Sequence, residues 1–127
     1  RAVTGLRLHP GTDRYDLEAA LGRPGLQGFV LEGYGAGNGP TESWFLDPLR
    51  SAVDRGVTIC ITTQCRAGSV VGGLYASGSA LLATGAVSGG DMTFEAALTK
   101  LMVLTDRHGP DDVRRLMQQD MAGELSV

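Results

Sequence analysis

The feature that most constrains the fold is a short segment, Gly28–Leu31, in which no position is polar. A strand with one face in water alternates apolar and polar residues, whereas a strand covered by helices on both faces is apolar throughout. This segment therefore indicates the interior of a parallel sheet. Other stretches are equally rich in β-branched and aliphatic side chains. We predict three strands, at Val3–Leu8, Gln27–Leu31 and Val57–Thr62.

Helical patterns separate these strands. Between the first two, Thr12–Gly22 has cap candidates at its start, apolar residues at helical spacing and a glycine at its end. Between the second and third, Trp44–Asp54 also has helical spacing. Pro48 leaves two alternatives there: Asp47 caps a helix that starts at the proline, or a helix that starts near Thr41 is kinked. The alternation predicts right-handed βαβ units in an α/β domain.

The second half of the chain has a different composition. Residues 69–86 are dominated by Gly, Ala, Ser and Leu, which fits either a helix packed through small residues or a glycine-rich loop leading into one. The strongest helical pattern follows over Glu95–Leu104, with Asp91 as a cap. One face of this helix is expected to hold Leu98, Leu101 and Met102.

A last helix is predicted to start at Pro110. Proline suits the first helical position, and the acids Asp111 and Asp112 are favoured there by the helix dipole. Its buried stripe is expected to be Val113, Leu116 and Met117. No repeat or linker is visible, so residues 1–127 are predicted to form one domain.

Composition narrows the function classes. With 43% apolar and 20% charged residues, the chain is suited to a globular fold with a core. The charged residues, with a net charge of −3, are scattered and form no basic stripe, which argues against nucleic-acid binding. No apolar run is long enough for a membrane span.

Cys60 and Cys65 lack a CxxC spacing, so we expect reduced thiols and a cytoplasmic setting. The start at Arg1 rather than Met suggests a fragment or a processed chain.

A glycine-rich segment, Gly33–Pro40, directly follows the second predicted strand. Ligands of open α/β sheets bind beyond the carboxyl ends of strands, where such loops lie. A dinucleotide-binding G-x-G-x-x-G motif is excluded, because its sixth position would be Asn38 when counted from Gly33 and Pro40 when counted from Gly35. The segment therefore remains either a ligand-binding loop or a plain turn before a helix.

The third predicted strand ends in a group of polar residues, namely Thr62, Thr63, Gln64, Cys65 and Arg66. A neighbouring cation favours the thiolate of Cys65, but a nucleophilic cysteine also needs a base. The two histidines are His9, at the end of the first predicted strand, and His108, between two predicted helices. A histidine in such a segment is more often a surface residue than a base, so a self-contained Cys–His enzyme is not supported. No Cys/His pair has metal-ligand spacing, and Cys60 is most simply a core residue. We predict no metal and no cofactor.

Several blocks together resemble one family. In order they are Leu8–Gly11, Leu31–Pro40, Thr63–Gly68 and Ser88–Leu101, the last reading Asp-Met-Thr-Phe-Glu-Ala-Ala-Leu-Thr-Lys-Leu from Asp91. Over nearly the whole chain they resemble the C-terminal domain of type I, bacterial cytoplasmic L-asparaginases. The resemblance implies a small three-layer α/β domain with a parallel sheet of three to four strands flanked by helices. It also implies an amidohydrolase that converts L-asparagine to aspartate and ammonia, as a homodimer or homotetramer.

In that family the nucleophilic threonine belongs to a larger N-terminal domain, which this chain does not contain, so no residue here is expected to be catalytic. The resemblance implies that the smaller domain completes a neighbouring subunit's active site through a loop matching Gly35–Asn38. Some members also hold a regulatory asparagine. The implied substrate- or effector-binding residues are Glu32, Gly33, Tyr34, Asn38, Gln64 and Cys65. Regulated enzymes carry Arg where Glu32 stands, so we expect no regulatory site.

Two alternatives remain open. The fold is similar to the asparaginase-like subunit of the archaeal glutamyl-tRNA amidotransferase, and the chain is also compatible with a stand-alone ligand-binding or dimerisation module. An upstream reading frame encoding a T-G-G-T-type strand would favour the enzyme, and its absence would favour the module.

Overall fold

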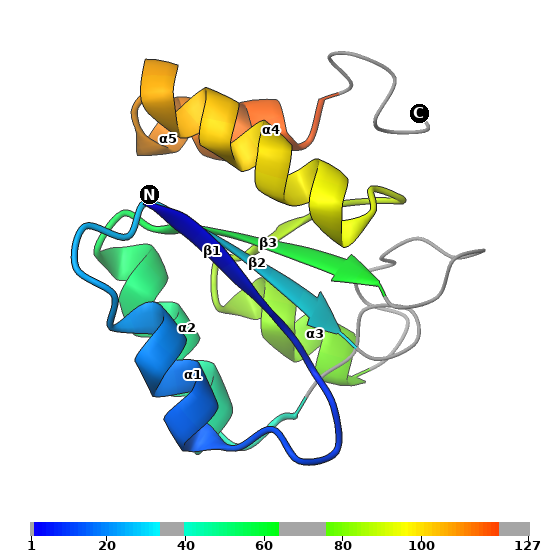
Figure 1. Cartoon of the computed structure of the whole chain (residues 1–127). Coiled ribbons are helices and arrows are strands. Elements are labelled where there is room, and N and C mark those ends of the chain that lie inside the picture. Colours follow the sequence, from blue (N-terminus) through cyan, green and yellow to red (C-terminus); the bar gives the residue numbers. More distant parts are fainter. Residues whose placement is uncertain (1, 34–39, 64–75, 120–127) are drawn as a thin grey trace.

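A computed structural model describes residues 2–33, 40–63 and 76–119, with the side chains of 76–79 excepted. The chain forms three layers, with a parallel sheet between two layers of helices (Figure 1). The elements in chain order are β1 (Val3–Arg7), α1 (Arg14–Leu21), β2 (Gly28–Gly33), α2 (Ser43–Asp54), β3 (Thr58–Thr63), α3 (Ala76–Ala83), β4 (Val87–Ser88), α4 (Phe94–Arg107) and α5 (Pro110–Met117).

The sheet has four parallel strands in the order β1-β2-β3-β4, which confirms the predicted fold class. All three predicted strands are present, with ends shifted by one or two residues. In β2, Phe29, Val30 and Leu31 are fully buried, as expected for a strand covered on both faces. The fourth strand has only two residues, which is too short to leave a pattern in the sequence.

The distribution of helices follows from this strand order. Each strand lies beside the previous one in the same direction, so right-handed crossovers place every connecting helix on the same face. Accordingly α1, α2 and α3 cover one face of the sheet (Figure 1). The opposite face is covered by α4 and α5, which follow the last strand (Figure 1).

The first two helices start differently. Asp13 caps α1 and accepts hydrogen bonds from the backbone N–H groups of Tyr15 and Asp16, while the Asp16 side chain accepts one from the Asp13 N–H. Helix α2 begins at Ser43, so Pro48 lies inside it rather than at its first position. The alternative in which Asp47 caps this helix is therefore wrong.

Two expectations about α4 need correction. Its N-cap is Thr93, whose hydroxyl accepts a hydrogen bond from the Ala96 N–H at 3.0 Å, so Asp91 is not the cap. Met102 is 40% exposed, whereas Lys100 is only 8% exposed. The buried face of the helix is thus rotated from the one predicted. An apolar pattern cannot show this when a lysine stem provides part of the buried face.

The rest of the second half agrees with the sequence interpretation. Part of the segment at 69–86 is helical, as α3, while residues 69–75 lie outside the described residues. Helix α5 begins at Pro110 after the N-cap Gly109, with Asp111 and Asp112 in its first turn, as predicted. Val113 and Met117 are buried, and Leu116 is half-buried.

Each face of the sheet has its own hydrophobic cluster. The face under α1, α2 and α3 buries Leu17, Phe29, Leu31, Phe45, Leu49, Ile59, Ile61 and Leu81, among others. The face under α4 and α5 buries Val3, Val30, Cys60, Val87, Met92, Ala97, Leu101, Leu104, Val113 and Met117. No helix among the described residues is long and apolar enough to cross a membrane.

Candidate functional site

The candidate site lies at the edge of the sheet where the parallel strands end. Arg7, Glu32 and Thr62 are register neighbours there, on β1, β2 and β3 respectively. Neighbouring residues in register project to the same side of a sheet, and side chains alternate along each strand. Since Val30 and Cys60, two positions earlier, pack in the cluster under α4 and α5, the polar row continues that face.

Glu32, a predicted binding residue, is held close to the end of β1. Its side chain is 14% exposed, and one carboxylate oxygen lies 3.5 Å from Nε of Arg7. Its backbone carbonyl accepts a hydrogen bond from the Leu8 N–H at 3.0 Å. Gly33, the other predicted residue on β2, is buried at the last position of the strand. The carboxylate is therefore present at this edge and already paired with a guanidinium.

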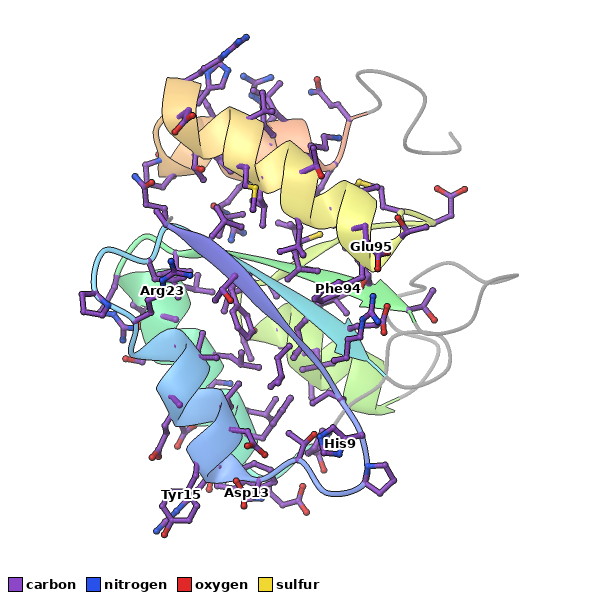
Figure 2. The ribbon with its side chains drawn as sticks, in the orientation of Figure 1. His9, Asp13, Tyr15, Arg23, Phe94 and Glu95 are labelled. Carbon is purple, nitrogen blue, oxygen red and sulfur yellow. The ribbon has the colours of Figure 1, made fainter. Side chains whose placement is uncertain are left out.

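Arg7 connects the sheet edge to the start of α4. A second nitrogen of its guanidinium is paired with the carboxylate of Glu95, and the group lies over the ring of Phe94 at 4.6 Å from the centroid. Phe94 and Glu95 begin α4 beside the ends of the strands (Figure 2). Two carboxylates thus share one cation.

A glycine on β1 makes room for this arrangement. A Cβ at Gly5 would lie 2.6 Å from the Phe94 ring and 2.8 Å from the Val30 carbonyl oxygen. Real Cβ atoms do not approach other atoms this closely, so the ring rests directly on bare backbone. The position of Phe94, and with it the cation–π contact of Arg7, depends on the absence of a side chain at Gly5.

Thr62 carries an unusual hydroxyl. Its side chain is fully buried, and its Oγ1 atom has no hydrogen-bond partner among the described residues. A Cβ at Gly89 would lie 3.1 Å from its methyl carbon, so the chain after β4 packs tightly against it. A buried polar group without a partner costs about 1–3 kcal/mol. The neighbouring Thr63, also named from the sequence, is 9% exposed.

The described residues do not assemble a nucleophile and its base. The thiol of Cys60 is fully buried, and burial raises its pKa from 9.0 to about 12, although nearby Lys100 acts in the opposite direction. This thiol remains protonated at neutral pH, which confirms its interpretation as a core residue. His9 is exposed and its Nδ1 accepts a hydrogen bond from the Gly11 N–H at 3.1 Å, so it shapes a turn.

The other predicted binding residues cannot be placed. Tyr34, Asn38, Gln64 and Cys65 lie outside the described residues. Within the described ranges, no group of three or more His, Cys, Asp or Glu side chains is placed to hold a metal ion. Sequence reasoning also missed Arg7, Phe94 and Glu95 as members of this edge. A charged residue inside the predicted strand Val3–Leu8 was the available signal for Arg7.

Comparisons with known proteins agree with this architecture. The sequence profile described as "Glutaminase/Asparaginase C-terminal domain" matches residues 2–117. The chain is 38% identical to L-asparaginase 1 of Escherichia coli over 94% of its length, and 43% identical to the human 60 kDa lysophospholipase over 95%. It is 39% identical, over 97% of its length, to one of the subunits of the glutamyl-tRNA(Gln) amidotransferase of Methanopyrus kandleri.

A solved structure with a similar fold is that of L-asparaginase I from Vibrio cholerae, with a TM-score of 0.89 and 36% identity. The match covers all of this chain and 38% of that one. The chain is a small parallel α/β domain with polar residues at the carboxyl ends of its strands, and the family profile matches most of its length. These two findings together identify its protein family. The chain belongs to the glutaminase/asparaginase C-terminal domain family. It spans 35% of the Escherichia coli relative and 21% of the human one.

Proposed function

We propose that this chain is the C-terminal domain of an L-asparaginase that hydrolyses L-asparagine to L-aspartate and ammonia in asparagine catabolism. The observation that carries the proposal is the match, over the whole described fold, to an asparaginase structure more than twice as long. Burial keeps the Cys60 thiol protonated, so this thiol is not an activated nucleophile. The nucleophilic threonine is assigned to an N-terminal domain outside this chain.

Within that enzyme, the domain supports the active site of a neighbouring subunit. The segment proposed to face the substrate is Gly35–Asn38, which follows β2 in the chain. The ion pair between Arg7 and Glu32 joins the end of β2 to the end of β1. We assign the domain to a cytoplasmic homodimer or homotetramer. Sedimentation equilibrium of the full-length protein tests the assembly, and a strict monomer would reject this role.

Ammonia release tests the division of labour. The 127-residue chain alone is expected to release no ammonia from asparagine or glutamine above a buffer blank. The longer natural protein that contains it is expected to turn over asparagine. Turnover by the isolated chain would contradict the assignment of the nucleophile to another domain. An inactive longer protein would reject the asparaginase proposal.

The amidotransferase relatives favour a second candidate, part of an asparaginase-like subunit of a glutamyl-tRNA(Gln) amidotransferase. The 39% identity over 97% of the chain supports it. The two candidates differ in their requirements: a free asparaginase acts alone, whereas a subunit of a glutamyl-tRNA(Gln) amidotransferase acts together with the other subunits of that enzyme. Comparing asparagine and glutamine turnover by the purified longer protein, with and without co-purified partners, separates them.

We propose further that no regulatory asparagine site operates here. The α-carboxylate of an effector pairs well with a guanidinium, whereas the Glu32 carboxylate repels it. Among the described residues Arg7 is the cation at this edge, and it already pairs with Glu32 and Glu95. Calorimetric titration of asparagine into the intact enzyme, with its catalytic site blocked, is expected to give no saturable heat. Saturable binding that is lost on Tyr34→Ala or Cys65→Ala would overturn this proposal.

A further inference from the structure

At the opposite edge of the sheet, where the strands begin, the surface contains a hollow of about 240 Å³. Figure 2 shows Arg23 near this edge, away from Phe94 and Glu95. The hollow lies between the ends of α1 and α2 and the starts of β2 and β3. Its lining residues are Leu21, Arg23, Gly25, Leu26, Arg55 and Val57.

Two arginines from different loops line this hollow, and none of the described residues that line it carries a carboxylate. Arg55 donates to uncharged oxygens, the hydroxyl of Ser51 at 3.1 Å and the carbonyl of Leu21 at 3.5 Å. Arg23 has no ion pair and no side-chain hydrogen bond within the part of the chain that the structure describes.

Helix dipoles offset only part of this charge. Helix α1 ends at Leu21 and α2 ends at Asp54, so both carboxyl ends adjoin the hollow. A helix end carries the equivalent of about half a negative charge. The two ends together balance about one of the two guanidinium charges, and a net positive charge remains.

The geometry of the hollow suits a small oxyanion. Guanidinium groups present parallel N–H donors that match the oxygens of a phosphate or carboxylate. Gly25 has a positive φ of 75°, and a Cβ there would meet no atom within 4 Å, so the loop leaves the mouth open. Leu21, Leu26 and Val57 also line the hollow. A volume of about 240 Å³ accommodates a few heavy atoms rather than a large ligand.

We propose that this hollow is a binding site for a small oxyanion, phosphate or a short carboxylate, held between the guanidinium groups of Arg23 and Arg55. The site is independent of the asparaginase assignment, because it lies at the other edge of the sheet and uses none of the residues named there.

The test is a titration of the isotope-labelled 127-residue chain with inorganic phosphate at constant ionic strength, followed by amide chemical shifts. A matched titration with acetate separates a phosphoryl ligand from a carboxylate. We expect saturable shifts of the Leu26 and Val57 amides, with a dissociation constant on the order of millimolar for so open a site. Phosphate is expected to bind more tightly than acetate because it carries up to two charges, and the reverse order would identify a carboxylate as the natural class.

Variants give the deciding comparison. Arg23→Ala and Arg55→Ala are each expected to weaken binding several-fold, and the double variant is expected to abolish saturation. Arg50→Ala is the matched control, because Arg50 is an exposed arginine of α2 that pairs with Asp47 outside the hollow. Linear shifts without saturation, or saturable shifts that persist in the double variant, would overturn the proposal. Equal weakening by the Arg50 variant would reveal general attraction to positive charge and would also reject it.

Discussion

The two faces of the sheet are built from different chemistry. The cluster under α1, α2 and α3 contains only apolar side chains, whereas the opposite face includes a thiol, a buried lysine and thioethers. Towards the carboxyl ends of the strands, this second face continues into the row of Arg7, Glu32 and Thr62. One face thus contributes mainly to stability, and the other combines packing with the polar groups of the candidate site.

The largest effect is expected on the apolar face. Phe45 is fully buried there, so Phe45→Ala should lower the free energy of unfolding by about 3–5 kcal/mol through lost burial and a cavity. Met102 on the outer surface of α4 is the control, and Met102→Ala should change stability by less than about 0.5 kcal/mol. Urea denaturation measures both. Similar values for the two variants would show that Phe45 is not a core residue.

The opposite face should respond to alkaline pH through Cys60. Its pKa is raised by burial from 9.0 to about 12, so the unfolded chain loses this proton at lower pH than the folded chain does. The contribution of this thiol to the free energy of unfolding is fully present below about pH 9. It falls as the pH rises from about 9 to about 12 and stays constant above that range. The difference corresponds to about 4 kcal/mol at the alkaline limit.

Denaturation of the wild type and of Cys60→Ala across this pH range checks the prediction. The variant should have the flatter profile, each protein being compared with its own stability at neutral pH. Cys65 is present in both proteins, so its contribution cancels. Parallel profiles would mean that the thiol ionises as readily in the folded chain as in the unfolded one.

A smaller effect is expected from the buried lysine of the same face. Lys100 Nζ donates hydrogen bonds to the backbone carbonyls of Met117 and Gln119, and so joins α4 to the end of α5. Lys100→Ala should cost roughly 2–4 kcal/mol, because it removes both donors and the aliphatic stem. Lys100→Met keeps most of the volume, and its cost should be about half as large.

Hydrogen exchange locates this effect. In both variants the amides near the end of α5 should exchange faster. The exchange rates of the α1 amides should change only as much as the overall free energy of unfolding changes. A Lys100→Met protein as stable as the wild type would show that desolvation of the ammonium cancels its hydrogen bonds.

The contrast between the faces also explains what the sequence could predict. The strands, the cap at Asp13 and the helix start at Pro110 follow local rules of apolar patterning and turn chemistry, so they were predictable. The burial of Lys100 was not, because its acceptors belong to carbonyls 17 and 19 residues away. The contact of Arg7 with Glu95 spans 88 positions. Packing of α4 on the sheet creates it, and no local signal in the sequence could specify the partner.

The smallest effect is expected at the polar row itself. Arg7 is 54% exposed and Glu95 71% exposed, so solvent screens their attraction, and the longer pair with Glu32 is only partly sheltered. Exposed ion pairs contribute about 0–1 kcal/mol. Arg7→Ala should therefore destabilise the domain by about 1 kcal/mol or less, including its contact with Phe94.

A double-mutant cycle separates the pair from its surroundings. Arg7→Ala, Glu32→Gln and the double variant should give a coupling free energy below about 1 kcal/mol, decreasing with added salt. Arg7→Lys is the matched control, since it keeps the charge but lacks the planar group that lies over Phe94. Coupling well above this value, unaffected by salt, would mean that Glu32 is buried far more deeply than its 14% exposure indicates. The polar row would then be as important to stability as the cores beneath it, and the division between the two faces would no longer hold.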